Sequence, residues 1–413
     1  MSGIIKIVLN SGKDQSPKRF HPWIFSGAVK RVEGEVKNGD IVEVYSHSNE
    51  FLGMGHYQKG SIMVRLFSFE KVEPDTRQNE SFGLATFWKS KIQKAYDYRQ
   101  SIGLTNDANT NVYRLVYGEG DGLPGLIIDF YNGTAVFQAH SIGMYRERHH
   151  IVEALKEVYG DKLKSVYDKS KESLGVSGTK VPQESEEENE LRNGYLFGSG
   201  SAKEVLENAH KFSIDWEEGQ KTGFFIDQRE NRKLVAQYAP GKKVLDCFCY
   251  AGGFSVYALK AGAAEVHSVD SSKAAIKLTD NNINLNFGEA ANHISHVADA
   301  FDYLGAHSGE YDMMIIDPPA FAKHRDARHQ AVMGYRRLNA LAIKGIKPGG
   351  IIFTFSCSQV VDKYLFHGAI TAAAIDAGRN VRIVKYLSHP VDHPISIYHP
   401  EGEYLKGMIL FVE

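Results

Sequence analysis

Hydrophobic and polar residues alternate with a period of two through roughly the first 70 residues. The alternation falls into four short runs separated by Gly, Asn or Asp, at residues 4–9, 40–45, 51–55 and 61–66. Short alternating runs that are broken by turn residues are typical of a small antiparallel barrel. The pattern therefore predicts an all-β barrel over residues 1–72.

The hydrophobic pattern changes after this barrel. Residues 82–102 repeat with helical spacing, and we expect strands at 111–116, 125–131 and 135–140 and a helix at 144–158. Residues 171–193 are rich in Ser, Glu, Gly and Lys and indicate a solvated loop. Together these segments predict a mixed α+β domain over residues 73–205.

From Phe212 onward, buried strands alternate with helical segments. We expect strands at 243–248, 265–270, 293–297, 313–317, 350–356, 381–387 and 405–412. Five or more βα units predict a doubly wound, mainly parallel sheet, because each crossover returns its strand in the same direction. The fold class is therefore α/β, with a Rossmann-like sheet in a third domain over residues 206–413.

Composition narrows the class of protein without naming its chemistry. The chain has 413 residues, of which 43% are hydrophobic and 24% charged, and it has no apolar run near the ~20 residues that span a bilayer. Three cysteines are too few for a disulfide framework and do not have zinc-site spacing. We expect a cytoplasmic protein with no signal peptide, no membrane contact and no metal. The net charge of −2 means that any polyanion site is a local basic patch.

The first candidate site is the turn that follows the strand at 243–248. Its residues Tyr250, Ala251 and Gly252 lead into a helix, and such a turn presents backbone N–H groups to a ligand. The segment lacks the G-x-G-x-x-G pattern of dinucleotide sites and the Walker pattern. Asp246, on the strand itself, suits a cationic ligand better than a pyrophosphate.

Acidic residues stand at four successive strand ends: Asp246, Asp270, Asp299 and Asp317. The alternative for any single one of them is that it caps a strand-to-helix turn. In open α/β sheets, however, ligands bind where these strand ends meet. Asp270 is placed to accept ribose hydroxyls and Asp299 an adenine amino group. The set predicts S-adenosylmethionine (SAM) as cofactor and resembles the class I methyltransferase pattern.

The segment just before the sheet, residues 218–232, contains too many glycines and polar groups for an ordinary helix start. We expect it to fold over the methionine end of the cofactor, with Gln228 or Arg229 reaching the carboxylate. The alternative is a capping loop that enters a helix at 229–238, with Asp227 as its N-cap.

Cys357, at the end of the fifth strand, is the candidate nucleophile. C5 of cytosine is not nucleophilic until a thiolate has added to C6, so methylation at C5 needs such a cysteine. Asp317 is the candidate partner for the base. Pro318 would stiffen the loop that carries the base, and Phe321 or Tyr250 would stack on it. The alternative for any cysteine is the apolar core, which we assign to Cys247 and Cys249.

Two further motifs lie outside the sheet. Lys18, Arg19 and Trp23 place basic groups beside aromatic ones, as an RNA-binding surface requires, although Trp23 and Phe25 also suit a buried corner under the barrel. The C-terminal histidines at 389–399 lack the spacing of helical metal ligands, and we expect a loop and hairpin beside the active site.

Taken together, these motifs resemble the RlmI-type family of 23S rRNA cytosine-5 methyltransferases. The resemblance rests on residues 21–27, 120–129, 219–232, 251–255, 317–319, 356–358 and 392–394 and spans nearly the whole chain. It implies a PUA-like RNA-binding barrel, SAM as cofactor, large-subunit rRNA as partner and Cys357 as nucleophile. Ala320 follows Asp317-Pro318-Pro319, so there is no second cysteine at this motif.

Two other functions remain open at this point. In an N-methyltransferase that acts on an RNA purine, Asp317 would orient an exocyclic amine and Cys357 would take no part. In an RNA-binding module, the sheet would hold SAM without turnover. A homodimer is a further expectation.

Overall fold

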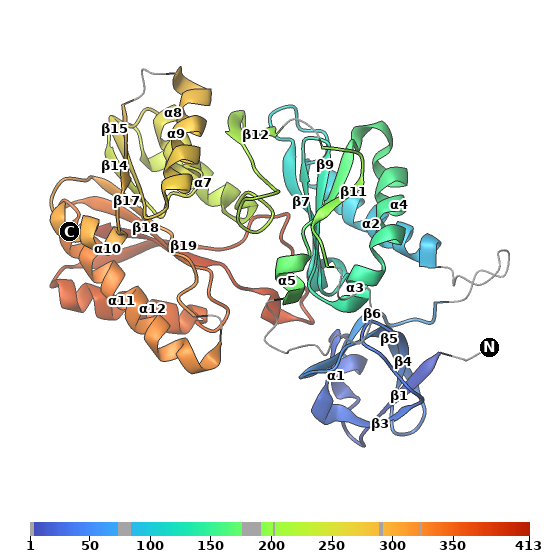
Figure 1. The fold of residues 1–413 in the computed structure, drawn as a ribbon. Helices are drawn as coiled ribbons and strands as arrows, with labels where there is room; N and C mark the ends of the chain where they lie inside the picture. The colour runs from blue at the N-terminus through green and yellow to red at the C-terminus, as the bar shows by residue number, and fades with distance from the viewer. Residues whose placement is uncertain (1–3, 73–83, 176–190, 201–202, 289–291, 323) are drawn as a thin grey trace. The chain divides into compact units, whose positions relative to one another are not determined.

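The computed structural model describes residues 4–72, 84–175, 191–200, 203–288, 292–322 and 324–413 (Figure 1). The described chain forms two compact units. The first comprises residues 1–205, 214–224 and 391–402, and the second comprises 206–213, 225–390 and 403–413. Most of the expected loop at 171–193 lies outside the described residues, although its start forms a short helix, α5 (Lys171–Gly175).

The first unit begins with a six-stranded barrel sheet in the order β2-β6-β5-β4-β1-β3. Its strands are β1 (Ile5–Leu9), β2 (Trp23–Phe25), β3 (Val29–Glu33), β4 (Ile41–Tyr45), β5 (Phe51–Tyr57) and β6 (Ile62–Ser68), with a short helix α1 (Gln15–Lys18) after β1. Alternate residues such as Ile7, Val42 and Val64 fill its centre. The expected barrel is confirmed. The sequence pattern missed β2, because three residues are too few to show a period, and β3, because its hydrophobic and polar residues do not alternate.

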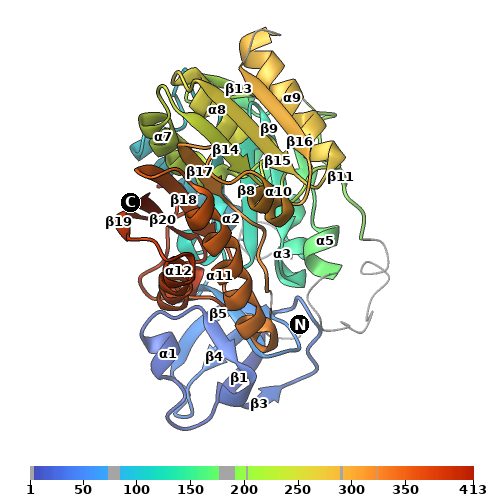
Figure 2. The same ribbon diagram turned by 90° about the vertical axis from the view of Figure 1, so that its left-hand side faces the viewer.

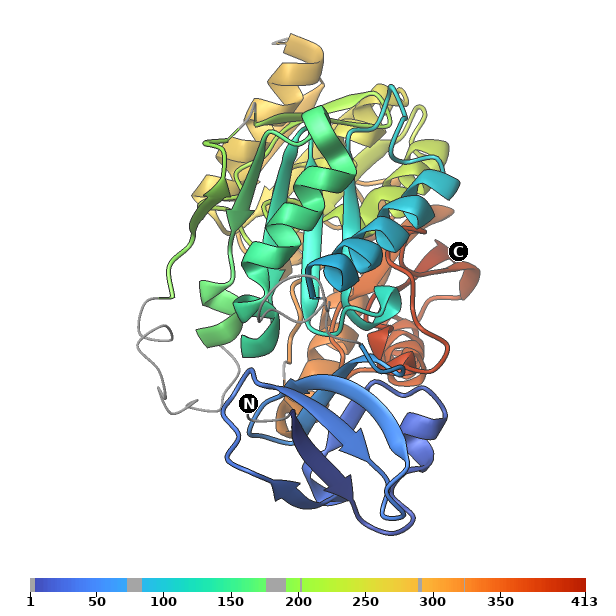
Figure 3. The same ribbon diagram turned by 90° about the vertical axis from the view of Figure 1, so that its right-hand side faces the viewer.

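A second sheet of the first unit has the order β11-β10-β9-β8-β7. Its strands are β7 (Val112–Tyr117), β8 (Leu126–Tyr131), β9 (Thr134–Ala139), β10 (Ser165–Asp168) and β11 (Gly194–Phe197). Helices α2 (Leu84–Ser101) and α4 (Arg148–Tyr159) pack together (Figure 3). Trp88 of α2 is 0% exposed and lies in the apolar core of this unit.

The helix expected at 144–158 is two helices, α3 (Ile142–Arg146) and α4. They meet at Glu147, whose carboxylate accepts the indole N–H of Trp88 at 2.7 Å and lies 2.8 Å from Nδ1 of His150. Periodicity cannot show this break, because hydrophobic residues continue on both sides of it.

A segment near the C-terminus, Val391–Gly402, belongs to the first unit. Asp392 is 0% exposed; its carboxylate accepts the backbone N–H of Arg114 at 2.9 Å, and its carbonyl accepts Nη2 of Arg99 at 2.8 Å. The Arg114 side chain in turn pairs with buried Asp129 through two bonds of 2.7 and 2.8 Å. Buried charges that are paired and hydrogen-bonded fix one arrangement of this segment.

The second unit contains a seven-stranded sheet in the order β16-β15-β14-β17-β18-β20-β19 (Figure 2). The strands are β14 (Lys243–Cys247), β15 (Glu265–Asp270), β16 (His293–Val297), β17 (Met313–Ile316), β18 (Gly350–Ser356), β19 (Val381–Leu387) and β20 (Lys406–Val412). The first five are parallel and β20 is antiparallel to both neighbours. This confirms the Rossmann-like class, and all seven strands lie where the hydrophobic pattern placed them.

Helices cover both faces of this sheet. One apolar core joins it to α10 (Ala300–Ala306), α11 (Arg328–Gly345) and α12 (Lys363–Ala377), and another joins it to α7 (Arg229–Tyr238) and α8 (Gly253–Lys260). Helix α9 (Lys273–Phe287) contacts α8 and β15. Because β14 lies between β15 and β17, the strand order reverses there, and the carboxyl ends of these strands form the ligand-binding edge.

None of the helices in the described part of the chain is both long and apolar enough to cross a membrane.

Candidate active site

The turn between β14 and α8 has an unusual backbone. Phe248 and Tyr250 have φ values of 62° and 50°, in the left-handed region that non-glycine residues rarely adopt. Gly252 has φ 69°, and a Cβ there would lie 2.7 Å from Cγ2 of Thr279. Strain of this kind persists only where the surrounding structure enforces it, and it is concentrated at ligand sites.

Asp246 is the most deeply buried acid at this edge. It is 0% exposed, and its Oδ2 accepts the backbone N–H of Ser255 at 3.1 Å and the hydroxyl at 2.7 Å. Its Oδ1 is buried and accepts no hydrogen bond from the described residues. Burial raises the pKa of Asp246 to about 7, against the lowering effect of the Ser255 bonds. A buried carboxylate with one unmatched oxygen fits a cationic ligand.

The Asp246 carboxylate lies at the end of a hydrogen-bonded chain. Oγ of Ser255 lies 2.6 Å from Oγ of Ser268, which lies 2.8 Å from Nε2 of His293. Burial lowers the pKa of His293 to about 4, so the ring is neutral near pH 7. When Asp246 is ionised, each group in the chain donates toward the carboxylate, and such chains strengthen their members. Ser255 lies in the motif at residues 251–255, but no pattern in the sequence assigned a role at this site to Ser255, Ser268 or His293.

Asp270 and Asp299 both accept backbone hydrogen bonds. Asp270 accepts from Tyr250 at 3.2 Å and from Ser272 at 2.9 Å. Asp299 is the N-cap of α10 and accepts from Phe301 at 2.8 Å and from Asp302 at 3.3 Å. The capping role weighed for the acids is therefore present in Asp299. A carboxylate has further lone pairs, so the cap leaves its role toward adenine as a prediction.

Asp317, Gln228 and Cys357 belong to segments far apart in the sequence but lie together. Nε2 of Gln228 donates to Oδ2 of Asp317 at 3.0 Å. Cys357 is partly exposed, and its Sγ lies 4.0 Å from the carbonyl oxygen of Pro318. The thiol thus lies at the carboxyl end of β18 beside the segment 317–319, on the same edge as Asp246.

Lys406 completes this group, although no motif in the sequence singled it out. It is 7% exposed, and its Nζ donates to the carbonyl of Ser358 at 2.7 Å. Burial lowers the pKa of Lys406 to about 8, while attraction to Cys357 acts to raise it. The same attraction favours the thiolate, which is the nucleophilic form of a cysteine.

Models of two known families match the chain. A PUA-like domain matches residues 7–69, and an S-adenosylmethionine-dependent methyltransferase matches residues 194–394. A protein of Pseudoalteromonas atlantica is 38% identical over 413 residues, with 98% of each chain covered, and one of Shewanella amazonensis is 36% identical with the same coverage. Both are named "Ribosomal RNA large subunit methyltransferase I".

The chain belongs to this methyltransferase family. A methyltransferase from Streptococcus mutans has the same fold, with a TM-score of 0.80 and 24% identity over 99% of this chain and 100% of that one. Another solved methyltransferase, in complex with SAH, has a TM-score of 0.81, 24% identity and the same coverage. The enzyme therefore uses SAM, as the acids at the strand ends predicted.

The segment ahead of α7 differs at one residue from the capping loop that was the alternative interpretation. Helix α7 begins at Arg229 as predicted, but Asp227 is not its N-cap; Gln228 occupies that position without a side-chain bond. Asp227 instead accepts the hydroxyl of Tyr404. Arg229 is 1% exposed, with its Nε 3.4 Å from Glu230. Its reach toward the methionine carboxylate of SAM stays a prediction.

The aromatic residues expected to stack on a base are both partly exposed. The Phe321 ring lies 4.7 Å from that of Tyr335, and the Tyr250 ring lies 5.0 Å from that of Phe225, edge to face. By contrast, Cys247 and Cys249 are 0% and 6% exposed, and burial raises the pKa of each well above its ordinary value. Their assignment to the core is confirmed.

The basic and aromatic residues of the PUA-like barrel are arranged differently from a buried corner. Ile24 is buried, whereas Trp23 is partly exposed and Phe25 is 46% exposed. Lys18 is paired with Asp14 at 2.8 Å and Glu50 at 2.7 Å, which offsets its charge. Arg19 is exposed. The RNA-binding role of Lys18, Arg19 and Trp23 stays a prediction.

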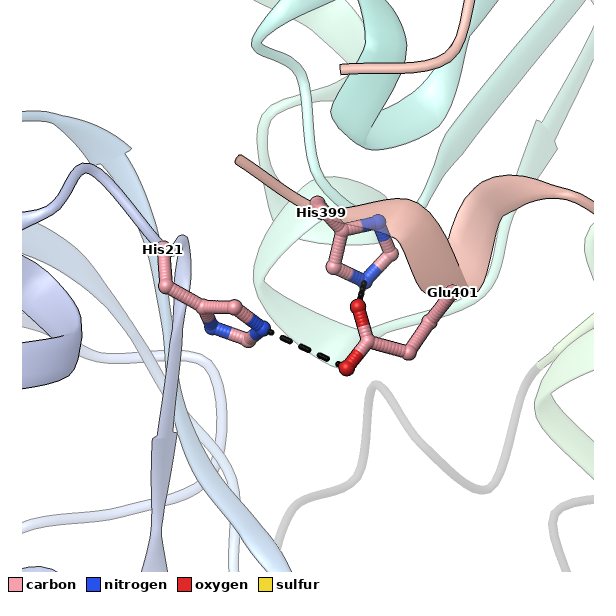
Figure 4. Close-up of side chains that lie close together, drawn as sticks. All are labelled: His21, His399 and Glu401. Atoms are coloured by element: carbon pink, nitrogen blue, oxygen red, sulfur yellow. Dashed lines mark ion pairs between the residues drawn. The ribbon is translucent and has the colours of Figure 1, made fainter. Parts of the chain in front are cut away.

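Within the described residues, one group of three side chains has donor atoms close enough for a metal: His21, His399 and Glu401 (Figure 4). Glu401 lies 3.6 Å from Nε2 of His21 and 3.8 Å from Nε2 of His399. Nδ1 of His21 accepts the backbone N–H of Trp23 at 3.2 Å, so the neutral ring carries its proton on Nε2, facing Glu401. Ion-pair contacts between the carboxylate and the two histidines account for this group. His399 and Glu401 lie in the first unit, and the expected place of this loop beside the active site stays a prediction.

Proposed function

We propose that this enzyme transfers a methyl group from SAM to C5 of a cytosine in large-subunit rRNA, with Cys357 as the nucleophile. The observation that carries the proposal is the partly exposed thiol of Cys357 beside residues 317–319, with the Lys406 cation near it. The names of the relatives, which specify large-subunit rRNA, support the class of substrate.

Cys357 performs the step that the base cannot perform alone. As a thiolate it adds to C6, which places electron density at C5. When bound, SAM supplies an electrophilic methyl group on a sulfonium. After the new C5–methyl bond has formed, loss of the C5 proton to a base allows the C6–S bond to break. The thiolate is released unchanged, with Lys406 again beside it.

Asp317 and its neighbours hold the target base. The Asp317 carboxylate, held by Gln228 at 3.0 Å, binds the N3 and amino edge of cytosine and stabilises protonation there as the thiolate adds. Pro318 fixes the backbone beside the thiol, and Phe321 or Tyr250 stacks on the base. The base must leave any helical stack to enter this site.

The residues that hold SAM follow from the same strand ends. Gly252 lets the ligand approach the turn, Asp246 faces its cationic end and Asp270 accepts the ribose hydroxyls. Asp299 binds the adenine amino group, and Gln228 and Arg229 lie toward the methionine end. The unmatched buried oxygen of Asp246 supports the fit of a cationic group here.

Three broader expectations remain part of the proposal. The barrel at 1–72 and the domain at 73–205 present the RNA to the catalytic domain at 206–413. The enzyme acts in the cytoplasm, where thiols stay reduced. Homodimer formation stays a prediction.

The proposal is tested by nucleoside analysis. Purified enzyme, SAM and a large-subunit rRNA transcript are incubated, and the RNA is digested and analysed by mass spectrometry. We expect 5-methylcytidine. An N-methylated purine would overturn the proposal in favour of the alternative in which Cys357 takes no part. SAM binding without any methylated nucleoside would favour an RNA-binding module.

A further inference from the structure

A groove of about 630 Å³ lies in the first unit, apart from the residues of the active site. Five segments line it: the residues after α1, the end of β6 with the residues that follow it, helix α2, the turn at 118–125 and part of the segment 391–402. The proposed function assigns no role to it.

Two large aromatic side chains at this groove are exposed. Phe20 is 49% exposed and Tyr398 is 51% exposed, with ring centroids 5.3 Å apart at an angle of 52°. Phe20 also contacts the Phe69 ring edge to face at 5.3 Å. Flat apolar surfaces of this kind are what an unstacked base binds.

The backbone at Phe20 is strained. Its φ is 62°, in the left-handed region that is a genuine outlier for a bulky residue. The cost of such a conformation is tolerated chiefly at functional sites. Here the conformation belongs to a residue whose ring is half exposed at the groove.

One wall of the groove carries cations. Phe87, Ser90, Lys91 and Lys94 lie on one face of α2, at helical spacing. Nζ of Lys91 donates to the carbonyl of Gly122 at 3.1 Å and lies 5.4 Å from the Phe87 ring centroid. Burial lowers the pKa of Lys91 to about 8, and repulsion from Lys94 acts in the same direction. Neither lysine has an ion pair among the described residues, so an anion would relieve both effects.

Glu70 and Glu119 are the acidic residues of the lining, and Glu119 is already engaged. The Glu119 carboxylate accepts the indole N–H of Trp23 at 2.8 Å. By contrast, Lys18, one of the two basic residues selected from the sequence, has two carboxylate partners. Unneutralised positive charge therefore gathers at α2 rather than at α1.

We propose that this groove binds an unpaired nucleotide of the substrate RNA, with the base against Phe20 and Tyr398 and a phosphate at Lys91 and Lys94. The inference rests on the proposed RNA substrate. It adds a second point of attachment, so that recognition involves a nucleotide other than the methylated one. Aromatic faces beside uncompensated cations match a base and its phosphate better than they match an acidic or apolar peptide.

The first experiment measures binding of the full-length protein to a fluorescein-labelled single-stranded dodecamer of uridine by anisotropy. Tyr398→Ala and Phe20→Ala are each expected to weaken binding about tenfold, the typical effect of removing one stacking partner. Tyr398→Phe keeps the ring and should bind like the wild type. Tyr386→Ala, which removes a 62% exposed ring in the second unit, should also change nothing.

A salt titration separates the cations from the rings. Lys91→Met and Lys94→Met should each reduce the slope of log affinity against log salt by about one, as expected for one lost phosphate contact. Tyr398→Ala should leave that slope unchanged. A duplex RNA of the same length should bind wild type and ring variants equally, because its bases are not free to stack.

Cross-linking tests the wild-type protein without any variant. A dodecamer that carries 4-thiouridine should cross-link to peptides containing Phe20 or Tyr398. Cross-links confined to other peptides, or unchanged affinity of both ring variants, would overturn the inference. The same results are expected if the groove instead binds a peptide. If the ring variants weaken RNA binding but wild type forms no 5-methylcytidine, the groove stands and the proposed function fails.

Discussion

The catalytic edge of the sheet and the groove of the first unit both contain lysines of lowered pKa, yet they are built differently. At the catalytic edge, Lys406 lies beside Cys357, and acids follow successive strands of one sheet. In the groove, Lys91 lies among aromatic rings contributed by segments far apart in the sequence. The first arrangement suits making and breaking bonds, and the second suits holding a ligand without reacting with it.

This difference predicts that substitutions in the two regions affect different properties of the enzyme. In the proposed mechanism, the catalytic edge depends on single atoms, such as Sγ of Cys357, for which no neighbour substitutes. The groove depends on area and charge shared among several side chains. Substitutions at the catalytic edge should therefore give large effects on turnover, and substitutions in the groove moderate effects on RNA affinity.

The largest expected effect is that of Cys357→Ala. Methyl transfer to rRNA should fall below detection, because no other exposed thiol lies at the catalytic edge within the described residues. SAM affinity, measured by calorimetry, should stay near the wild-type value. Cys249→Ala is the matched control, since it removes a buried thiol and should retain activity. A large loss of SAM binding in Cys357→Ala would contradict a nucleophile role.

Asp270→Ala should weaken SAM binding by about 1–3 kcal/mol, because ribose hydroxyls would lose a charged acceptor. Calorimetry measures this directly. Asp302→Ala, which removes an exposed acid from the first turn of α10, serves as control. Unchanged affinity in Asp270→Ala would remove Asp270 from the cofactor site.

Lys406→Met should lower kcat about tenfold at pH 7 and shift the pH–rate profile to higher pH. Without the ammonium group, the thiol of Cys357 ionises less readily, so a higher pH is needed for the same thiolate fraction. Lys406→Arg, which keeps the charge, should shift the profile less. A uniform loss of rate at every pH would indicate that Lys406 only supports the fold through Ser358.

SAM affinity should itself depend on pH through Asp246, whose pKa is about 7 in the free protein. Above pH 7 the carboxylate is charged and attracts the cation, and below pH 7 it is neutral. Affinity should therefore increase about tenfold from pH 6 to pH 8, provided that bound SAM holds the carboxylate ionised. Asp246→Asn should bind weakly with little pH dependence. An equally steep dependence in that variant would assign the effect to another group, of which Asp270 is the nearest acid.

The smallest expected effect belongs to the groove. Raising the pH from 7 to 9 removes the charge of Lys91, whose pKa is about 8, so single-stranded RNA affinity should fall about threefold. The other charged groups of the lining are Glu70, Lys71, Lys94 and Glu119. Lys91→Met should lack this pH dependence, and its persistence in that variant would separate Lys91 from the phosphate site.

Sequence reasoning succeeded where the chemistry follows strand order. The seven strands of the catalytic sheet are long enough to show their hydrophobic pattern, and parallel strands carry Asp246, Asp270 and Asp317 to one edge. Cys357 was identified because it follows one of those strands. Local sequence and global fold agree here, so motifs in the sequence indicate which residues lie at this edge.

The parts that escaped prediction depend on contacts between distant segments. Lys406 lies beside Cys357 only because β20 pairs with β18 in an antiparallel register. Val391–Gly402 belongs to the first unit, where buried Asp392 accepts a hydrogen bond from Arg114, 278 residues away in sequence. The groove likewise forms from residues that no single motif contains. Spacing along the chain carries no information on such pairings.

The most direct test is to trap the enzyme on RNA that contains 5-fluorocytidine in place of cytidine. Fluorine at C5 cannot leave as a proton does, so the bond from C6 to the enzyme should persist after methyl transfer. Mass spectrometry of the digested complex is predicted to find the nucleotide on the peptide that contains Cys357, only when SAM is present, in wild type and Cys249→Ala but not in Cys357→Ala. Absence of any adduct while 5-methylcytidine still forms on ordinary RNA, or an adduct on a different residue, would contradict the account.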